Sequence, residues 1–126
     1  MEEQELQIYT TTGKDNKEYK NIVLKTKVDK ATGEVRQGLK TDHFITVEKA
    51  FADGRKVAGG ADWTMFGCGA KYKGEEVSFV LYDRDHDAWK ECGGVGDVIR
   101  ISAYTHKYKY QDVEKSTLKL KFELVE

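Results

Sequence analysis

Hydrophobic and polar residues alternate along much of the chain, and this alternation predicts β-strands. Near the N-terminus, Ile22, Leu24 and Val28 fall on one face of an extended segment, while Lys25 and Lys27 fall on the other. A period of two places successive side chains on opposite faces, so the segment predicts a half-buried strand. The same reasoning assigns further strands to residues 6–12, 43–51, 77–83, 98–110 and 117–125.

One segment breaks the alternation and predicts the only helix. Residues 84–91 are polar and helix-prone, and they have room for at most about two turns. A glycine-rich turn follows and Asp97 leads into the long strand at 98–110. Gly33 and the pair Asp53-Gly54 mark two more turns. The glycine- and aromatic-rich residues 56–74 predict one short strand, 63–66, flanked by loops.

Composition limits the classes of protein that the chain can represent. At 126 residues it fits one domain, 1–126, with the acidic residues 1–5 expected to be disordered. No apolar run has the length of a membrane span, and the N-terminus lacks the apolar core of a signal peptide, so we expect a cytoplasmic protein without a membrane partner. Cys68 and Cys92 are then expected as free thiols, with a disulfide between them left open.

Charge is segregated along the chain. The net charge of −1 argues against a highly basic DNA-coating protein, but local clusters of cations matter more than the total. Acidic residues gather at the N-terminus and at 83–91. The candidate phosphate-binding cations are Lys25, Lys27, Lys71, Arg100, Lys107 and Lys109.

The order of elements in the C-terminal half resembles that of the OB-fold single-stranded DNA-binding proteins of the SSB and RPA kind. The matching segments are residues 76–82, 86–91, 96–102 and 118–125. The resemblance implies an all-β fold, a five-stranded OB-fold barrel with one short helix between strands three and four. Residues 20–28 would be strand one and residues 43–51 strand two. It also implies binding of unpaired strands without catalysis.

The strand at 98–110 carries aromatic and cationic residues together. Tyr104, Tyr108 and Tyr110 share one face with His106, while Lys107 and Lys109 fall on the other. Aromatic rings stack on unpaired bases, at about 1–3 kcal/mol each, and cations contact phosphates. The alternative, that the tyrosines only cover the surface of a hairpin, stays open.

A second aromatic group lies in the glycine-rich segment. Trp63 and Tyr72 are interpreted as base-stacking residues beside Lys71, and Phe66 as a core residue. The alternative is that Trp63 or Phe66 fills the core, since large rings dominate small cores.

The sequence contains no complete motif for metal binding or catalysis. Counted from Asp83, the glycine and glutamate positions of an EF-hand hold Ala88 and Gly94, so the acidic run is interpreted as a helix start whose carboxylates satisfy exposed amides. Cys68, His86 and Cys92 lack the paired spacing of a zinc site. No catalytic motif is present, so we expect neither an enzyme, nor a metal, nor a cofactor.

The leading hypothesis is a protein that binds single-stranded DNA, with RNA as the alternative ligand, largely without sequence preference. A second hypothesis is a structural β-barrel that assembles through exposed strand edges, which leaves a homo-oligomer open. A third is a barrel that binds carbohydrate or another small ligand on an aromatic platform.

Overall fold

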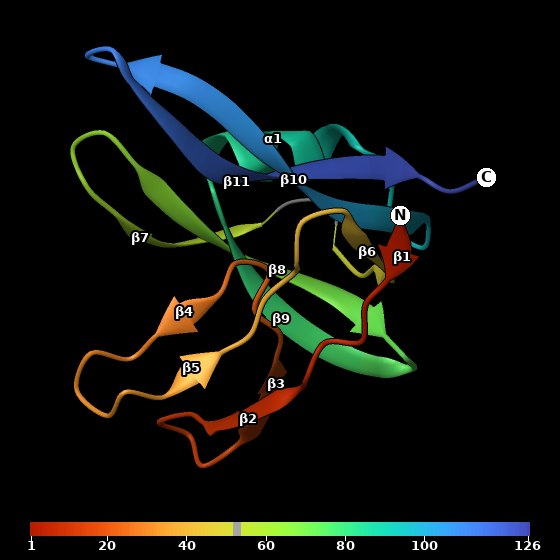
Figure 1. Cartoon of the computed structure of the whole chain (residues 1–126). Helices are drawn as coiled ribbons and strands as arrows, with labels where there is room; N and C mark the ends of the chain where they lie inside the picture. The colour runs from red at the N-terminus through yellow and green to blue at the C-terminus, as the bar shows by residue number, and fades with distance from the viewer. Residues whose placement is uncertain (52–53) are drawn as a thin grey trace.

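A computed structural model describes residues 1–51 and 54–126 as a mostly β fold with one helix (Figure 1). Its elements are β1 (Glu2–Glu3), β2 (Tyr9–Thr12), β3 (Glu18–Asn21), β4 (Lys27–Val28), β5 (Val35–Arg36), β6 (His43–Lys49), β7 (Arg55–Gly59), β8 (Thr64–Tyr72), β9 (Glu75–Tyr82), α1 (Asp83–Glu91), β10 (Val98–Tyr110) and β11 (Val113–Leu124). The bounds of β10 are those predicted from the sequence. Asp53, in the predicted Asp53-Gly54 turn, lies outside the described residues.

Within residues 1–51 and 54–126, nine strands form one open, mixed sheet. Its main path is β11-β10-β6-β8-β9-β3-β2, with β1 beside β6 and β7 beside β8. The β1–β6 and β3–β9 pairs are parallel, whereas the other ladders are antiparallel. Glu2 and Glu3, expected to be disordered, are held by the ladder to β6. β4 and β5 form a separate two-stranded sheet around the predicted turn at Gly33.

The prediction of a closed five-stranded OB-fold barrel is wrong. Strands β6, β8, β9, β10 and β11 occur in this order along the chain, with β7 between β6 and β8 and α1 between β9 and β10. In the described part of the chain, however, β9 and β11 share no ladder. The edge of β9 pairs instead with β3, where Asn21 lies opposite Ser78 and the N–H of Ile22 donates to the Ser78 carbonyl at 2.9 Å. The predicted strand one, 20–28, is therefore split between β3 and β4.

The glycine-rich segment also differs from its prediction of a short strand at 63–66. It forms the nine-residue strand β8, which pairs with β6, β7 and β9. Cys68 and Tyr72 point into the core, as alternation requires. A Cβ on Gly69 would lie 2.7 Å from the Phe51 ring, so glycine here allows a close approach rather than a loop.

The predicted helix at 84–91 is confirmed as α1, which contacts β8, β9 and β11. Trp89 is fully buried and anchors it, with its ring 5.2 Å from Phe79 and 6.1 Å from Phe122, both edge-on. Edge-to-face contacts of this kind add to the large apolar area that a tryptophan buries.

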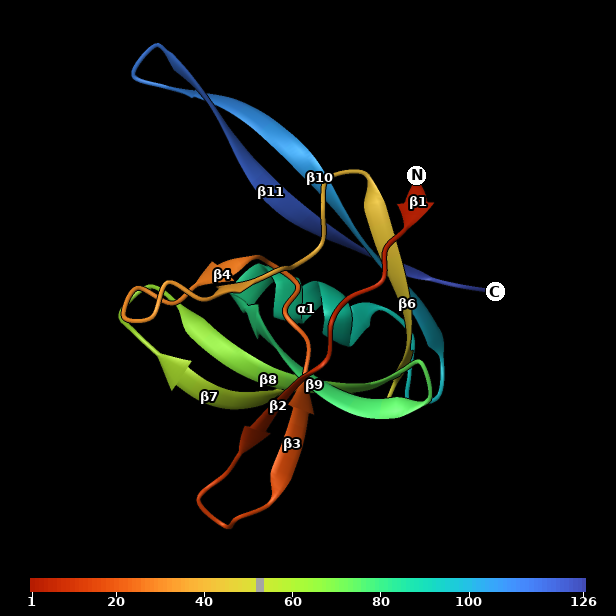
Figure 2. The same ribbon diagram turned by 60° about the horizontal axis from the view of Figure 1, so that its bottom comes forward.

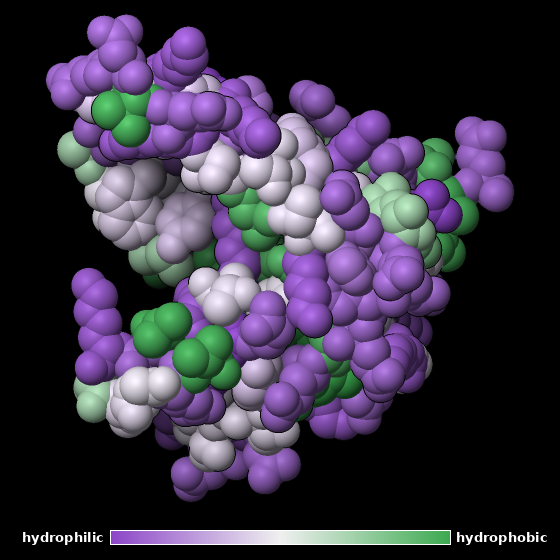
Figure 3. All heavy atoms as spheres, in the orientation of Figure 1, coloured by the Kyte–Doolittle hydropathy of each residue, from purple (hydrophilic) through white to green (hydrophobic). Residues whose placement is uncertain are grey.

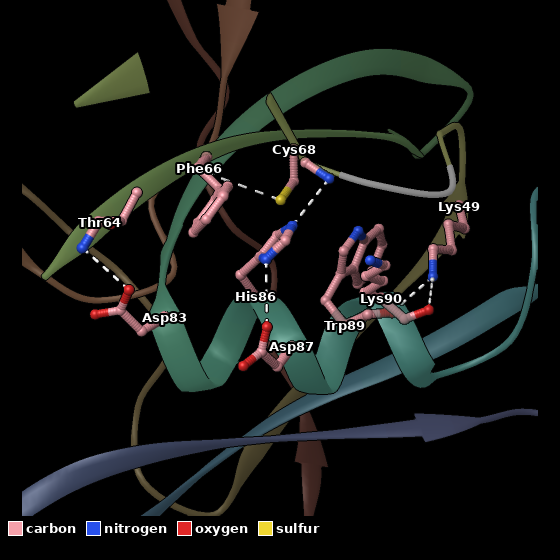
Figure 4. Close-up of polar contacts among 10 residues, drawn as sticks. Lys49, Thr64, Phe66, Cys68, Asp83, His86, Asp87, Trp89 and Lys90 are labelled. Atoms are coloured by element: carbon pink, nitrogen blue, oxygen red, sulfur yellow. Dashed lines mark hydrogen bonds and ion pairs between the residues drawn. The ribbon is translucent and has the colours of Figure 1, made fainter. Parts of the chain in front are cut away.

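The side chain of Lys49, on β6, contacts the C-terminal end of this helix (Figure 4). Its buried ammonium donates to the Trp89 carbonyl at 2.6 Å and lies 3.3 Å from the carbonyls of Lys90, Cys92 and Gly93. The last carbonyls of a helix have no partner within it, so a cation here satisfies them and complements the helix dipole.

The β10–β11 hairpin reaches well beyond the sheet. β10 pairs with β6 only from Val98 to Ala103, whereas its ladder with β11 continues to the end of both strands. Beyond Ala103, β10 pairs only with β11 among the described strands, and residues 104–117 are all exposed. Both views of the chain show the hairpin extending away from the other strands (Figures 1 and 2).

Candidate functional site

A groove follows the seam between β9 and β11, where the two strands do not pair. It consists of adjacent depressions of about 370, 60 and 540 Å3 that share lining residues, of which the first lies on the β4–β5 sheet and the other two lie at the seam itself. Lys27 lines the first and second, and Lys25, Tyr82, Asp85 and Leu120 line the second and third. We call these depressions together the seam groove. Figure 3 shows the surface hollowed on its left side, above the β4–β5 region.

An aromatic pair stands at the rim of this groove. Tyr82 ends β9 on the outward side, because Phe79 and Leu81 take the inward positions, and it is 43% exposed. The Trp63 ring, 45% exposed, lies 6.1 Å from the Tyr82 ring at an angle of 59°. The predicted Trp63 thus gains a partner that the sequence analysis missed, although alternation along 77–82 would have placed Tyr82 outward.

The opposite wall of the groove is the base of the β10–β11 hairpin. Tyr104 and Lys119 are register partners, so their side chains share a face, and both line the 540 Å3 depression. Tyr104 keeps 41% of its surface exposed.

The same face continues to the tip of the hairpin. Tyr108 pairs with Lys115, and the Lys115 ammonium lies 5.1 Å from the centre of the Tyr110 ring. The His106 and Tyr108 rings are nearly parallel, at 15°, with centres 6.2 Å apart. We call this surface the hairpin face, made of Tyr104, His106, Tyr108, Tyr110, Lys115 and Lys119.

The cations of this face are not the ones chosen from the sequence. Lys107 and Lys109 lie on the opposite face of β10, where Lys109 is paired with Glu114. Lys115 and Lys119 were missed because they come from β11, and only the register of the hairpin reveals which of its residues face the tyrosines.

Tyr72 and Lys71, two other residues predicted to bind the ligand, lie away from the groove. Tyr72 is 2% exposed and its hydroxyl accepts the N–H of Leu6 at 2.9 Å, so its ring is part of the core and is closed to a stacked base. Lys71 stands between two glutamates, its register partners Glu48 and Glu76. A cation so flanked has little net attraction for phosphate.

Arg100, also predicted to bind phosphate, lies against the surface of the sheet. It is partly buried, and its guanidinium lies 4.6 Å from the centre of the Phe44 ring. Phe66, predicted as core, is half-buried and stacks on His86 with ring centres 3.7 Å apart.

The acidic run begins α1 as predicted, with Asp83 and Asp85 in the first turn of the helix. Among the described residues, however, the N-cap position is Tyr82 and makes no side-chain hydrogen bond that caps the helix. Asp83 accepts the N–H of Thr64 on β8 at 3.0 Å instead, which ties the helix to the sheet (Figure 4). Asp85 faces the seam groove, with one carboxylate oxygen 3.5 Å from the Lys25 ammonium.

The cysteines are separate free thiols, so the disulfide left open is not formed. Burial raises the pKa of the Cys68 thiol from 9.0 to about 11, against a lowering effect of the Lys49 ammonium. Burial likewise raises the pKa of Cys92. Cys68 and His86 both flank Gly54, whose N–H donates to His86 Nε2 at 3.1 Å. Within 1–51 and 54–126, no three or more His, Cys, Asp or Glu side chains group as metal ligands.

Comparison with known proteins gave no match to a family model, a curated protein or a solved structure. Among the described residues, no helix has the length and apolar character needed to cross a membrane. The seam groove and the hairpin face are therefore the features of this chain that point to a ligand.

Proposed function

We propose that the protein binds single-stranded nucleic acid along the seam groove and the hairpin face. One observation carries the proposal: exposed aromatic rings and ammonium groups lie together along one path contributed by three parts of the chain. Unpaired bases offer flat faces to such rings, and the linking phosphates need cations nearby. In a duplex the bases are already stacked on one another, so the rings favour a single strand.

The path begins at Lys27 and Lys25 and passes the rings of Trp63 and Tyr82. It crosses to Tyr104 on the opposite wall and then follows the hairpin face to its tip. A net charge of −1 is compatible with this ligand, because local charge decides phosphate binding. Carboxylates of Asp29, Glu34, Asp83 and Asp85 line the seam groove beside its lysines, whereas the hairpin face carries Lys115 and Lys119 among its rings. DNA and RNA offer the same contacts here, and both belong in the test.

The proposal is tested by fluorescence anisotropy of labelled single strands, DNA and RNA, titrated with protein at several salt concentrations. Binding should weaken steeply with salt, and each phosphate contact removed should reduce the slope of log K against log salt by about 0.7. Lys115→Gln is the test variant and Lys109→Gln, on the opposite face, is its matched control. No binding at low salt and micromolar protein would refute the proposal.

A second candidate function, assembly through strand edges, also has a specific observation in its favour. β11 is twelve residues long and pairs only with β10 among the described strands, so its outer edge is open. Open edges invite pairing with another chain, but lysines along an edge strand discourage it, and β11 carries Lys115, Lys119 and Lys121. A dimeric or larger mass by light scattering, together with no strand binding, would favour this alternative.

A further inference from the structure

The largest depression of the seam groove has the dimensions and walls of a site for one base. Its volume of about 540 Å3 falls within the roughly 300–1,000 Å3 of small-ligand sites. Tyr82 and Tyr104 line it from β9 and β10, and Leu118 and Leu120 provide apolar surface. Such a site can accommodate a base between rings, with its polar edge directed at whatever polar group lies there.

The carboxylate of Asp85 is the polar group of interest, and it lines the same depression together with the charged side chains of Asp83, Arg84, Lys25 and Lys119. Its side chain is only 23% exposed, and its contact with Lys25, at 3.5 Å, is longer than a hydrogen bond of about 2.7–3.2 Å. No hydrogen bond to this carboxylate is present among the described residues. An ionised carboxylate accepts through both oxygens, so Asp85 retains acceptor sites for a ligand.

We propose, on the basis of the nucleic-acid binding proposed above, that this cleft selects bases that carry an exocyclic amino group. Cytosine, adenine and guanine each present N–H donors that a carboxylate accepts. At position 4, thymine and uracil present a carbonyl oxygen where cytosine has its amino group, and this acceptor repels a carboxylate placed there. The one donor that thymine and uracil keep on this edge is N3–H, between two carbonyl oxygens. Lys25 supplies the opposite charge that allows a polyanion to approach Asp85.

This selectivity departs from a binding site that is blind to sequence. Stacking alone tolerates every base, because every base has a π face. A base-edge hydrogen bond to a carboxylate adds discrimination, and we expect an oligo(dC) strand to bind about five- to tenfold more tightly than oligo(dT) of equal length.

The test compares oligo(dC) with oligo(dT) by anisotropy at one salt concentration and pH 7.5, where cytosine is neutral. The wild-type protein should prefer oligo(dC). Asp85→Asn should bring the two affinities within about twofold, because a carboxamide can also donate to the thymine carbonyl. Glu91→Gln, also on α1 but outside the groove, should leave the preference unchanged, and melting curves should show all variants folded.

The outcomes separate this inference from the proposed function. Equal binding of oligo(dC) and oligo(dT) by the wild-type protein would overturn the selectivity while leaving strand binding intact. A preference for oligo(dC) that survives Asp85→Asn would also overturn it. Failure of either strand to bind at low salt would overturn the proposed function itself.

Discussion

Lys49 is a charged side chain that stabilises the fold from a buried position. It is 1% exposed, its ammonium faces the carbonyls at the end of α1, and it lies 5.0 Å from the centre of the Trp89 ring. The backbone of the same residue also bonds to the turn after the helix, with its N–H donating to Asp97 and its carbonyl accepting from Gly96. One residue thus joins β6, the helix end and the start of β10.

Replacing Lys49 with Met should therefore destabilise the protein by about 2–4 kcal/mol, because buried carbonyls lose a charged donor. Urea unfolding monitored by circular dichroism measures the change. Lys56→Met, at an exposed position of β7, is the control and should alter stability by less than about 0.5 kcal/mol. Equal unfolding midpoints for the two variants would show that the Lys49 contacts contribute little.

Cys68 should make stability depend on alkaline pH. Burial raises the pKa of its thiol from 9.0 to about 11, so the folded protein keeps a proton that the unfolded chain releases in this range. Its contribution is complete below pH 9 and is lost as the pH rises toward 11, with a slope of up to about 1.4 kcal/mol per pH unit. Comparing wild type with Cys68→Ala isolates this effect from lysines and tyrosines, which titrate in both. Stability curves that stay parallel from pH 8 to 11 would contradict it.

At the scale of elements, the β10–β11 hairpin depends on a tight turn with unfavourable residues. Gln111 and Asp112 connect paired residues and have φ of 50° and 62°, the signature of a type I′ turn. The β8–β9 turn has the same form at Lys73 and Gly74, with φ of 53° and 79°. Glycine adopts such angles without the cost that a side chain imposes.

Asp112→Gly should accordingly stabilise the protein by about 0.5–1 kcal/mol, and Gly74→Asp should destabilise it by a similar amount. A Cβ on Gly74 would meet nothing within 4 Å, so the second change tests backbone conformation without a clash. Denaturant unfolding of both variants measures the pair, and shifts of the same sign would contradict the turn assignment.

The hairpin face should contribute binding energy without contributing core stability. Tyr108 is 41% exposed and contacts no core residue, so Tyr108→Ala should weaken strand binding about fivefold or more while leaving the melting temperature nearly unchanged. Tyr19→Ala is the matched control, since Tyr19 is 45% exposed on β3 and lies outside the seam groove. An unaltered affinity in Tyr108→Ala would remove the hairpin tip from the site.

Helices and strands could be predicted from the sequence where the local alternation of hydrophobic and polar residues determines them. Alternation gave β10 its bounds, and the break in alternation at 84–91 gave α1. The length of β8 was underestimated because its outward positions include Gly67 and Gly69, and glycines at these positions suggested a loop. In the structure they allow the side chains of Val57 and Phe51 to approach the strand closely. Ile22 and Leu24 are both buried as predicted, but burial alone did not show that the chain leaves the strand after Asn21.

At the scale of the whole molecule, the seam between β9 and β11 determines what the protein offers to a ligand. β3 occupies the edge of β9, and residues 22–25 run beside β9 and Leu120 of β11. Local sequence could not show this arrangement, since closure or opening of the sheet depends on which distant strand pairs with each of its edges. Tyr82, Lys25 and Lys119 come together only through that arrangement.

If a single strand lies against the rings of the seam groove, tryptophan fluorescence should report its binding. Trp63 is 45% exposed at the rim and Trp89 is fully buried, so a bound strand should quench Trp63 alone. Titration with an unlabelled single strand at low salt should lower the emission, salt should restore it, and Trp63→Phe should abolish the change. Emission that stays constant at saturating strand and micromolar protein would contradict the account.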